Sequence, residues 1–128
     1  ARLKFSDVSI SLNGSRTEAT VRMTRDGAIY SGSASGPGSP SSQMKLIAGA
    51  TLRAIEDSGL ASSSIVLEDA TEVPISGRRV AVVMVNMVTD RGEEILTGSA
   101  VIKQDVWKGV VNATLDAVNR RLAIPHGH

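Results

Sequence analysis

The chain has 128 residues, a length at which one domain buries most of the apolar surface that it must hide to fold, so we expect a single hydrophobic core. Fourteen basic and thirteen acidic side chains leave a net charge of +1, too small for the positive field that binds nucleic acids or anionic membranes. The absence of cysteine excludes a disulfide scaffold, a thiolate zinc site and a cysteine nucleophile. No stretch of apolar residues is long enough to cross a bilayer, and residues 1–7 lack a signal-peptide pattern, so we expect a cytoplasmic protein. We also expect neither a metal ion nor a cofactor.

The first half of the chain predicts three strands followed by a helix. Apolar and polar residues alternate in the segments predicted as strands, which are 8–12, 19–23 and 29–34. Asn13-Gly14, between the first two, is typical of a tight hairpin turn. A helix follows, with Ser39 as its N-cap, Pro40 at its first position and Gly59 after its end.

The second half repeats this order. Its predicted strands are 65–75, 78–89 and 93–102, and a helix over 106–122 follows, with Asp105 as its cap. The two halves match at offsets of 63, 66 and 63 residues, through the pairs Gly14 and Gly77, Gly32 and Gly98, and Ala50 and Ala113. We interpret the changed offset as one resized loop, the glycine-rich segment before the first helix.

These elements predict one α+β domain over 1–125, built from duplicated strand-strand-strand-helix units at about 4–60 and 63–123. We expect a mostly antiparallel sheet with both helices on one face. Residues 126–128 are expected to be a tail.

The segment 80–88 departs from alternation, because nearly all of its residues are apolar. Both faces of this strand are therefore expected to be buried, although two helices cover only one face of a sheet. A second copy of the chain is the favoured cover, and a sheet that curls over itself is the alternative. The residues expected at a homodimer interface are Val80, Val82, Met84, Val85 and Met87.

Few residues suit catalysis. The only histidines, His126 and His128, lie in the expected tail, where no scaffold orients them. Adjacent acidic residues, as at Glu93-Glu94, point to opposite faces of a strand and are expected to be solvated rather than to form a carboxylate dyad. We therefore do not expect an enzyme.

The segment 35–42 is rich in glycine and leads into a helix start, where free backbone N–H groups attract anions such as a carboxylate or phosphate. A flexible connection capped by Ser39 is the alternative. The segment lacks the lysine of a P-loop and the glycine spacing of a dinucleotide site. The helix-strand-strand-strand-helix order over 40–122 also occurs in double-stranded RNA-binding domains, but only two separated lysines, Lys103 and Lys108, lie where that fold has a basic cluster.

The end of the chain resembles a known family. The residues that carry the resemblance are Gly98-Ser99-Ala100-Val101-Ile102 and Asn112-Ala113-Thr114-Leu115-Asp116-Ala117-Val118-Asn119-Arg120-Arg121. They are similar to the closing segment of the C-terminal allosteric domain of 2-isopropylmalate synthase and citramalate synthase. That domain also consists of two strand-strand-strand-helix units and dimerises. The family's catalytic barrel has no counterpart in this sequence, so the resemblance implies no catalytic residue.

The resemblance implies a dimeric regulatory domain that binds a small carboxylate, such as a branched-chain amino acid, at loops beside the helix starts. The corresponding ligand-binding candidates are Gly36, Gly38, Ser39, Ser41, Ser42, Gly98, Ser99 and Asp105. A structural or protein-protein interaction module without a small-molecule ligand is the alternative function.

Overall fold

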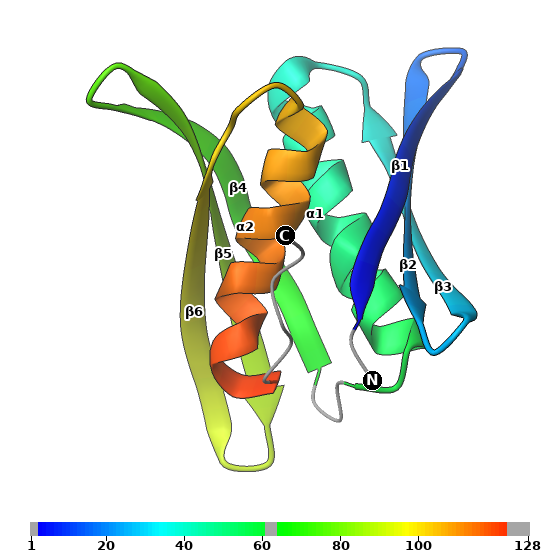
Figure 1. Cartoon of the computed structure of the whole chain (residues 1–128), viewed down its shortest axis with the longest axis vertical. Helices are drawn as coiled ribbons and strands as arrows, with labels where there is room; N and C mark the ends of the chain where they lie inside the picture. The colour runs from blue at the N-terminus through cyan, green and yellow to red at the C-terminus, as the bar shows by residue number, and fades with distance from the viewer. Residues whose placement is uncertain (1–2, 61–63, 123–128) are drawn as a thin grey trace.

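The computed structural model describes residues 3–60 and 64–122. In chain order, its elements are β1 (Lys4–Asn13), β2 (Arg16–Arg25), β3 (Ala28–Pro37), α1 (Pro40–Asp57), β4 (Ser64–Ile75), β5 (Arg78–Thr89), β6 (Gly92–Val101) and α2 (Val106–Leu122) (Figure 1). The order strand-strand-strand-helix occurs twice, so the predicted α+β class and duplicated units are confirmed. The tail predicted at 126–128 lies outside the described residues.

Each unit is an antiparallel meander joined by tight turns. Asp26 and Gly27 join β2 to β3 with φ of 53° and 80°, and Ser76 and Gly77 join β4 to β5 with φ of 52° and 74°. Two consecutive residues with positive φ give a hairpin turn whose twist matches that of the strands. The turns thus fix the antiparallel register within each unit.

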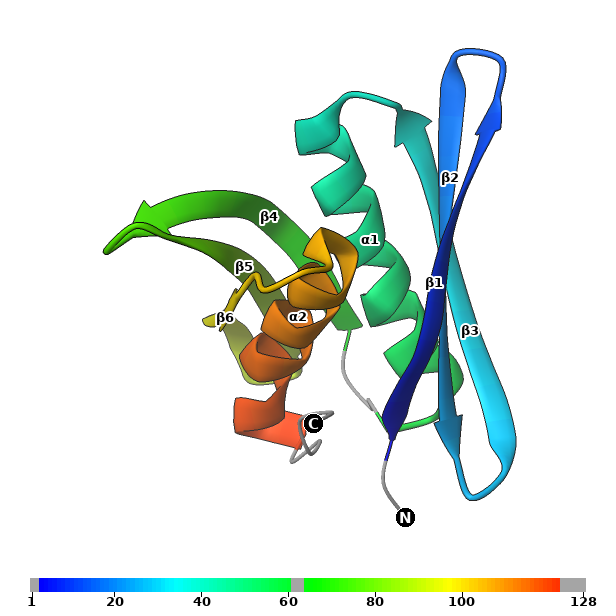
Figure 2. The same ribbon diagram turned by 45° about the horizontal axis from the view of Figure 1, so that its top comes forward.

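The six strands form two separate three-stranded sheets, in the orders β1-β2-β3 and β4-β5-β6, rather than one continuous sheet. Both helices lie between the two sheets (Figures 1 and 2). Helix α1 packs on β2, β3 and β4, and α2 packs on β5, β6 and α1. Each meander has one face to bury, and placing the helices between the two meanders buries both faces in one core.

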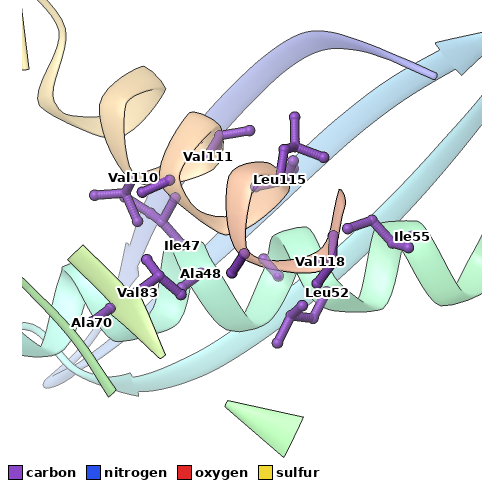
Figure 3. Packing of buried hydrophobic residues seen from close by; sticks show 14 of the residues in the cluster. Ile47, Ala48, Leu52, Ile55, Ala70, Val83, Val110, Val111, Leu115 and Val118 are labelled. Atoms are coloured by element: carbon purple, nitrogen blue, oxygen red, sulfur yellow. The ribbon is translucent and has the colours of Figure 1, made fainter. Parts of the chain in front are cut away.

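The shared core is aliphatic (Figure 3). Alternate residues of the central strands point toward the helices, including Val21 in β2 and Val83 in β5, which are at most 1% exposed. Ile47 of α1 and Val110 of α2 are completely buried in the same cluster. Neither described helix is long and apolar enough to cross a membrane.

The two units share the details of how a helix sits on a sheet. A Cβ atom on Gly32 of β3 would lie 2.3 Å from the Ala50 carbonyl oxygen of α1, and one on Gly98 of β6 would lie 2.2 Å from the Ala113 carbonyl oxygen of α2. Only glycine allows this close approach of helix and strand backbones. The packing therefore pairs the same residues that the sequence comparison matched.

The units differ in length at two places, not at one loop as the sequence suggested. In the β2–β3 hairpin, Val21 pairs with Gly32, eleven residues later. In the β5–β6 hairpin, Val83 pairs with Gly98, fifteen residues later, so this hairpin is four residues longer than β2–β3. Gly32 lies eighteen residues before Ala50, the alanine that it contacts, whereas Gly98 lies only fifteen residues before Ala113. The offset between the units is thus 62 residues at Val21 and Val83, 66 at Gly32 and Gly98, and 63 at Ala50 and Ala113. The first turns begin at Gly14 and Ser76, so Gly14 corresponds to Ser76 and not to Gly77 as the sequence suggested.

Candidate ligand site at the helix starts

The start of α1 is closed by its own side chains. The Ser39 hydroxyl accepts a hydrogen bond from the Ser42 backbone N–H at 3.4 Å and donates one to the Ser42 hydroxyl at 2.8 Å. The Gln43 side-chain amide donates to the Gly38 carbonyl at 3.1 Å. Ser39 is thus the N-cap, as predicted, and no charged residue occurs between 36 and 42.

The loop expected within 35–42 is reduced to Gly38 and Ser39, because β3 continues to Pro37 and α1 begins at Pro40. Gly36 pairs with Thr17 and packs beside Leu46, and Gly38 approaches Thr17 so closely that a Cβ atom would lie 2.6 Å from its hydroxyl oxygen. Thr17 is 1% exposed, and its hydroxyl has no hydrogen-bond partner among the described residues. Both glycines therefore serve close packing. Of the candidates here, only Ser39, Ser41 and Ser42 lie at the helix start itself.

In the second unit, Gly98 and Ser99 are also strand residues. Gly98 is buried against α2, where no ligand reaches it. The Ser99 backbone N–H donates a hydrogen bond to the Asp116 carboxylate at 2.9 Å. These two candidates therefore join β6 to α2.

The start of α2 is more open and contains charged residues. The Asp105 carboxylate accepts hydrogen bonds from the backbone N–H groups of Trp107, at 3.0 Å, and Lys108, at 3.3 Å, which makes it the cap of this helix. A cavity of about 520 Å³ lies beside it, and its lining residues are Val101, Lys103, Gln104, Asp105, Lys108, Gly109 and Asn112. The buried side-chain oxygen of Asn112 has no hydrogen-bond partner within residues 3–60 and 64–122. The lining of the cavity thus combines two lysines, one aspartate and two amide side chains.

Both helices begin toward the same end of the molecule (Figures 1 and 2). All residues that line the cavity nevertheless come from the end of β6 and the start of α2. Of the eight sequence candidates, only Asp105 lies in it. Lys108 and Asn112 were missed, although their spacing from Asp105 places all three on one side of a helix, a signal that the sequence contains.

The five residues expected at a dimer interface divide between the two faces of β5. Val85 is completely buried and Met87 is 4% exposed, because both point toward the helices. Val80, Val82 and Met84 point to the other face of the sheet, and Met84 is 39% exposed. Alternation along the strand thus removes Val85 and Met87 from the expected interface and places them in the core.

The acidic residues form separate ion pairs and hydrogen bonds. Glu94 accepts two hydrogen bonds from the Arg121 guanidinium, while its neighbour Glu93 accepts one from the Asn86 side chain on the opposite face of the sheet. Glu72 binds Arg79 in the same two-bond manner, at 2.6 and 2.8 Å. Among the described residues, no three acidic or histidine side chains are grouped as metal ligands.

The hydrogen bonds from Arg121 lower the pKa of Glu94 below its ordinary value of 4.5. Because this pKa is lower in the folded chain than in the unfolded chain, the pair stabilises the fold above pH 4.5. The stabilisation is lost as pH falls through the lowered pKa. We expect the urea midpoint of the wild type to fall more on acidification than that of Glu94→Gln, by a small amount since the pair is exposed. Glu18→Gln is the control, because Glu18 makes no ion pair within the described residues and lies on the other sheet, and it should follow the wild type; an equal acid response in all three proteins would contradict the prediction.

In comparisons with known proteins, no family model and no curated protein matches the chain.

Proposed function

We propose that this chain is a non-catalytic, dimeric regulatory domain that binds a small carboxylate in the cavity at the start of α2. The observation that carries the proposal is the composition of that cavity. Lys103 and Lys108 supply positive charge beside the start of α2, where the Asp105 carboxylate already caps the backbone N–H groups, and Gln104 and Asn112 supply amide groups. A volume of about 520 Å³ is in the range of small-molecule sites and exceeds what an amino acid needs.

The chemistry of the lining residues favours a small carboxylate. An ammonium group binds a carboxylate through charge-assisted hydrogen bonds. Asn112 also lines the cavity, and an amide side chain can donate and accept hydrogen bonds. The resemblance to the allosteric domain of 2-isopropylmalate synthase supports the same ligand class, since that family binds a branched-chain amino acid beside its helix starts.

A thermal-shift titration with leucine, isoleucine, valine and their keto acids tests the proposal. A ligand at about 100 times its dissociation constant adds about 2.7 kcal/mol, which raises the midpoint of a domain of this size by several degrees. The double variant Lys103→Gln/Lys108→Gln should lose this shift. Lys45→Gln is the matched control, because Lys45 occupies on α1 the position of Lys108 on α2, given that Ala50 corresponds to Ala113.

The result also separates the two candidate functions. No shift with any of the acids, or a shift that persists unchanged in the double variant, would contradict ligand binding in this cavity. The second candidate, a protein-protein interaction module without a ligand, would then be favoured, because large apolar side chains are exposed on the sheet β4-β5-β6.

A further inference from the structure

The two sheets differ in the face that points away from the helices. On the sheet β4-β5-β6 this outer face carries several large apolar side chains, with the polar residues Asn86, Thr97 and Ser99 among them. Its large exposed side chains, between 36% and 52% exposed, are Val66, Ile75, Met84, Val88, Ile95 and Val101. Large apolar side chains gathered on the exposed face of a sheet mark an interaction surface.

The duplicated fold supplies an internal comparison. Val21 pairs with Gly32, and Val83 pairs with Gly98, so Val21 and Val83 occupy the same place in the two units. Counting from them along β2 and β5, Thr20 corresponds to Val82 and Arg22 corresponds to Met84. Along the central strand, the outer face is thus polar in one unit and apolar in the other, at the same positions of the same fold. The fold itself does not require these apolar residues, so they need another explanation.

We infer that the outer face of β4-β5-β6 binds the same face of a second copy of this chain. The two copies are related by a two-fold axis that runs across the strands, which makes the strands antiparallel across the interface. This inference deepens the dimeric part of the proposed function, on which it rests, by naming the face and the arrangement. It does not depend on the ligand.

The charges at the two ends of the face favour this arrangement. Arg78 lies at the start of β5, and Glu93 pairs with Val88, ten residues along the same strand. Glu93 is held on the outer face by its hydrogen bond from Asn86, and Arg78 makes no ion pair within the described part of the chain. A two-fold axis midway between them places Arg78 of each copy opposite the partner's Glu93, so an antiparallel dimer pairs unlike charges at both ends.

The size of the face also suits a pair of copies. Three strands spaced at about 4.8 Å, with about ten residues each rising about 3.3 Å, present roughly 500 Å² per copy. Two such faces bury roughly 1,000 Å², the lower bound for a specific interface. A net charge of +1 leaves little repulsion between copies. We therefore expect a specific dimer. A charged side chain introduced at the centre of the interface should prevent its formation.

Sedimentation equilibrium over a wide concentration range tests the inference with a matched pair of variants. Ile95 and Ile29 occupy the same place in the two sheets and are 52% and 68% exposed. Ile95→Lys should raise the dissociation constant of the dimer at least about 100-fold, because it buries an unpaired charge. Ile29→Lys, on the polar sheet, should leave the dissociation constant unchanged. Circular dichroism checks that both variants fold, and Met84→Lys replaces Ile95→Lys if that variant does not.

Charge reversal tests the two-fold arrangement. Arg78→Glu and Glu93→Arg should each weaken the dimer about 5- to 10-fold, and the double variant should restore it, since every end contact then pairs unlike charges again.

A dimer that persists in Ile95→Lys would overturn the inference and leave the proposed dimer in place through another face. A wild type that is monomeric at all concentrations would overturn both this inference and the proposed dimer. The thermal-shift test of ligand binding would be unaffected. Absence of rescue in the double variant would overturn the antiparallel arrangement.

Discussion

Gly98→Ala is expected to destabilise the domain by about 3 kcal/mol or more, a large part of the stability of a domain of this size. A Cβ atom on this residue would lie 2.2 Å from both the Ala113 carbonyl oxygen and the Ala117 backbone nitrogen of α2. Those atoms belong to the helix backbone, so α2 must move away from β6 as a whole. The contacts that the shift disturbs include Val110 and Leu115, which are at most 1% exposed. Urea unfolding followed by circular dichroism measures the loss.

Two further glycines make this experiment specific. Gly32→Ala should have a similar effect, because its Cβ atom would lie 2.3 Å from the Ala50 carbonyl oxygen. Gly49→Ala is the control, since its Cβ atom would make an ordinary contact at 3.7 Å with Ala34 and alanine favours a helix interior. Gly49→Ala should leave stability unchanged or raise it by about 0.5–1 kcal/mol. A mild effect of Gly98→Ala, equal to that of Gly49→Ala, would contradict the close approach of α2 to β6.

The elements of each unit were predictable because local patterns determine them. The turn at Asn13-Gly14, the alternation along 19–23 and the cap residues Ser39 and Asp105 each act over a few neighbouring residues. The structure has strands, a turn and helices at these places, although the turn residues are Gly14 and Ser15, because Asn13 pairs with Arg16 as the last residue of β1. The duplication was predictable for the same reason, since Gly32 and Gly98 are retained where helix and strand backbones meet.

The division into two sheets was not predictable in this way. Alternation shows that a strand has one apolar face, but not whether that face meets a helix of its own unit or of the other. Here α1 contacts β4 of the second unit as well as β2 and β3. Such contacts between distant segments have no signature in a single sequence.

The candidate site was also only partly predictable from the sequence. In the glycine-rich segment 35–42, the residues before the helix start at Pro40 were expected to be a loop, because glycine and proline have low strand propensity. Pairing of Ser35, Gly36 and Pro37 with β2 overrides that propensity. The cavity instead lies at the other helix start, where Lys108 and Asn112 face it from the first turns of α2. Which polar residues of a helix border a cavity depends on what packs beside the helix, here the end of β6.

Leu115→Ala is expected to lower the stability of both units together, by about 3 kcal/mol. Leu115 is 1% exposed and belongs to the buried cluster that also contains Leu52 and Ile55 of α1 (Figure 3). Truncation of a buried leucine to alanine costs about 2–5 kcal/mol through lost burial and the cavity that remains. Since both helices lie between the two sheets, neither unit keeps its core when the other unfolds. The domain should therefore unfold as one cooperative unit.

The two units can be followed separately. Trp107, the only tryptophan, packs against the core in the second unit, so its fluorescence reports on that unit. Hydrogen exchange in β2 reports on the first unit. Leu115→Ala should shift both signals by the same free energy, and its counterpart Leu52→Ala on α1 should do likewise. Leu12→Ala, at a residue that is 76% exposed, is the control and should change stability by no more than about 0.5 kcal/mol. If Leu115→Ala accelerated exchange only in the second unit, the two meanders would be independent folding units, and the helices between them would join two cores rather than form one.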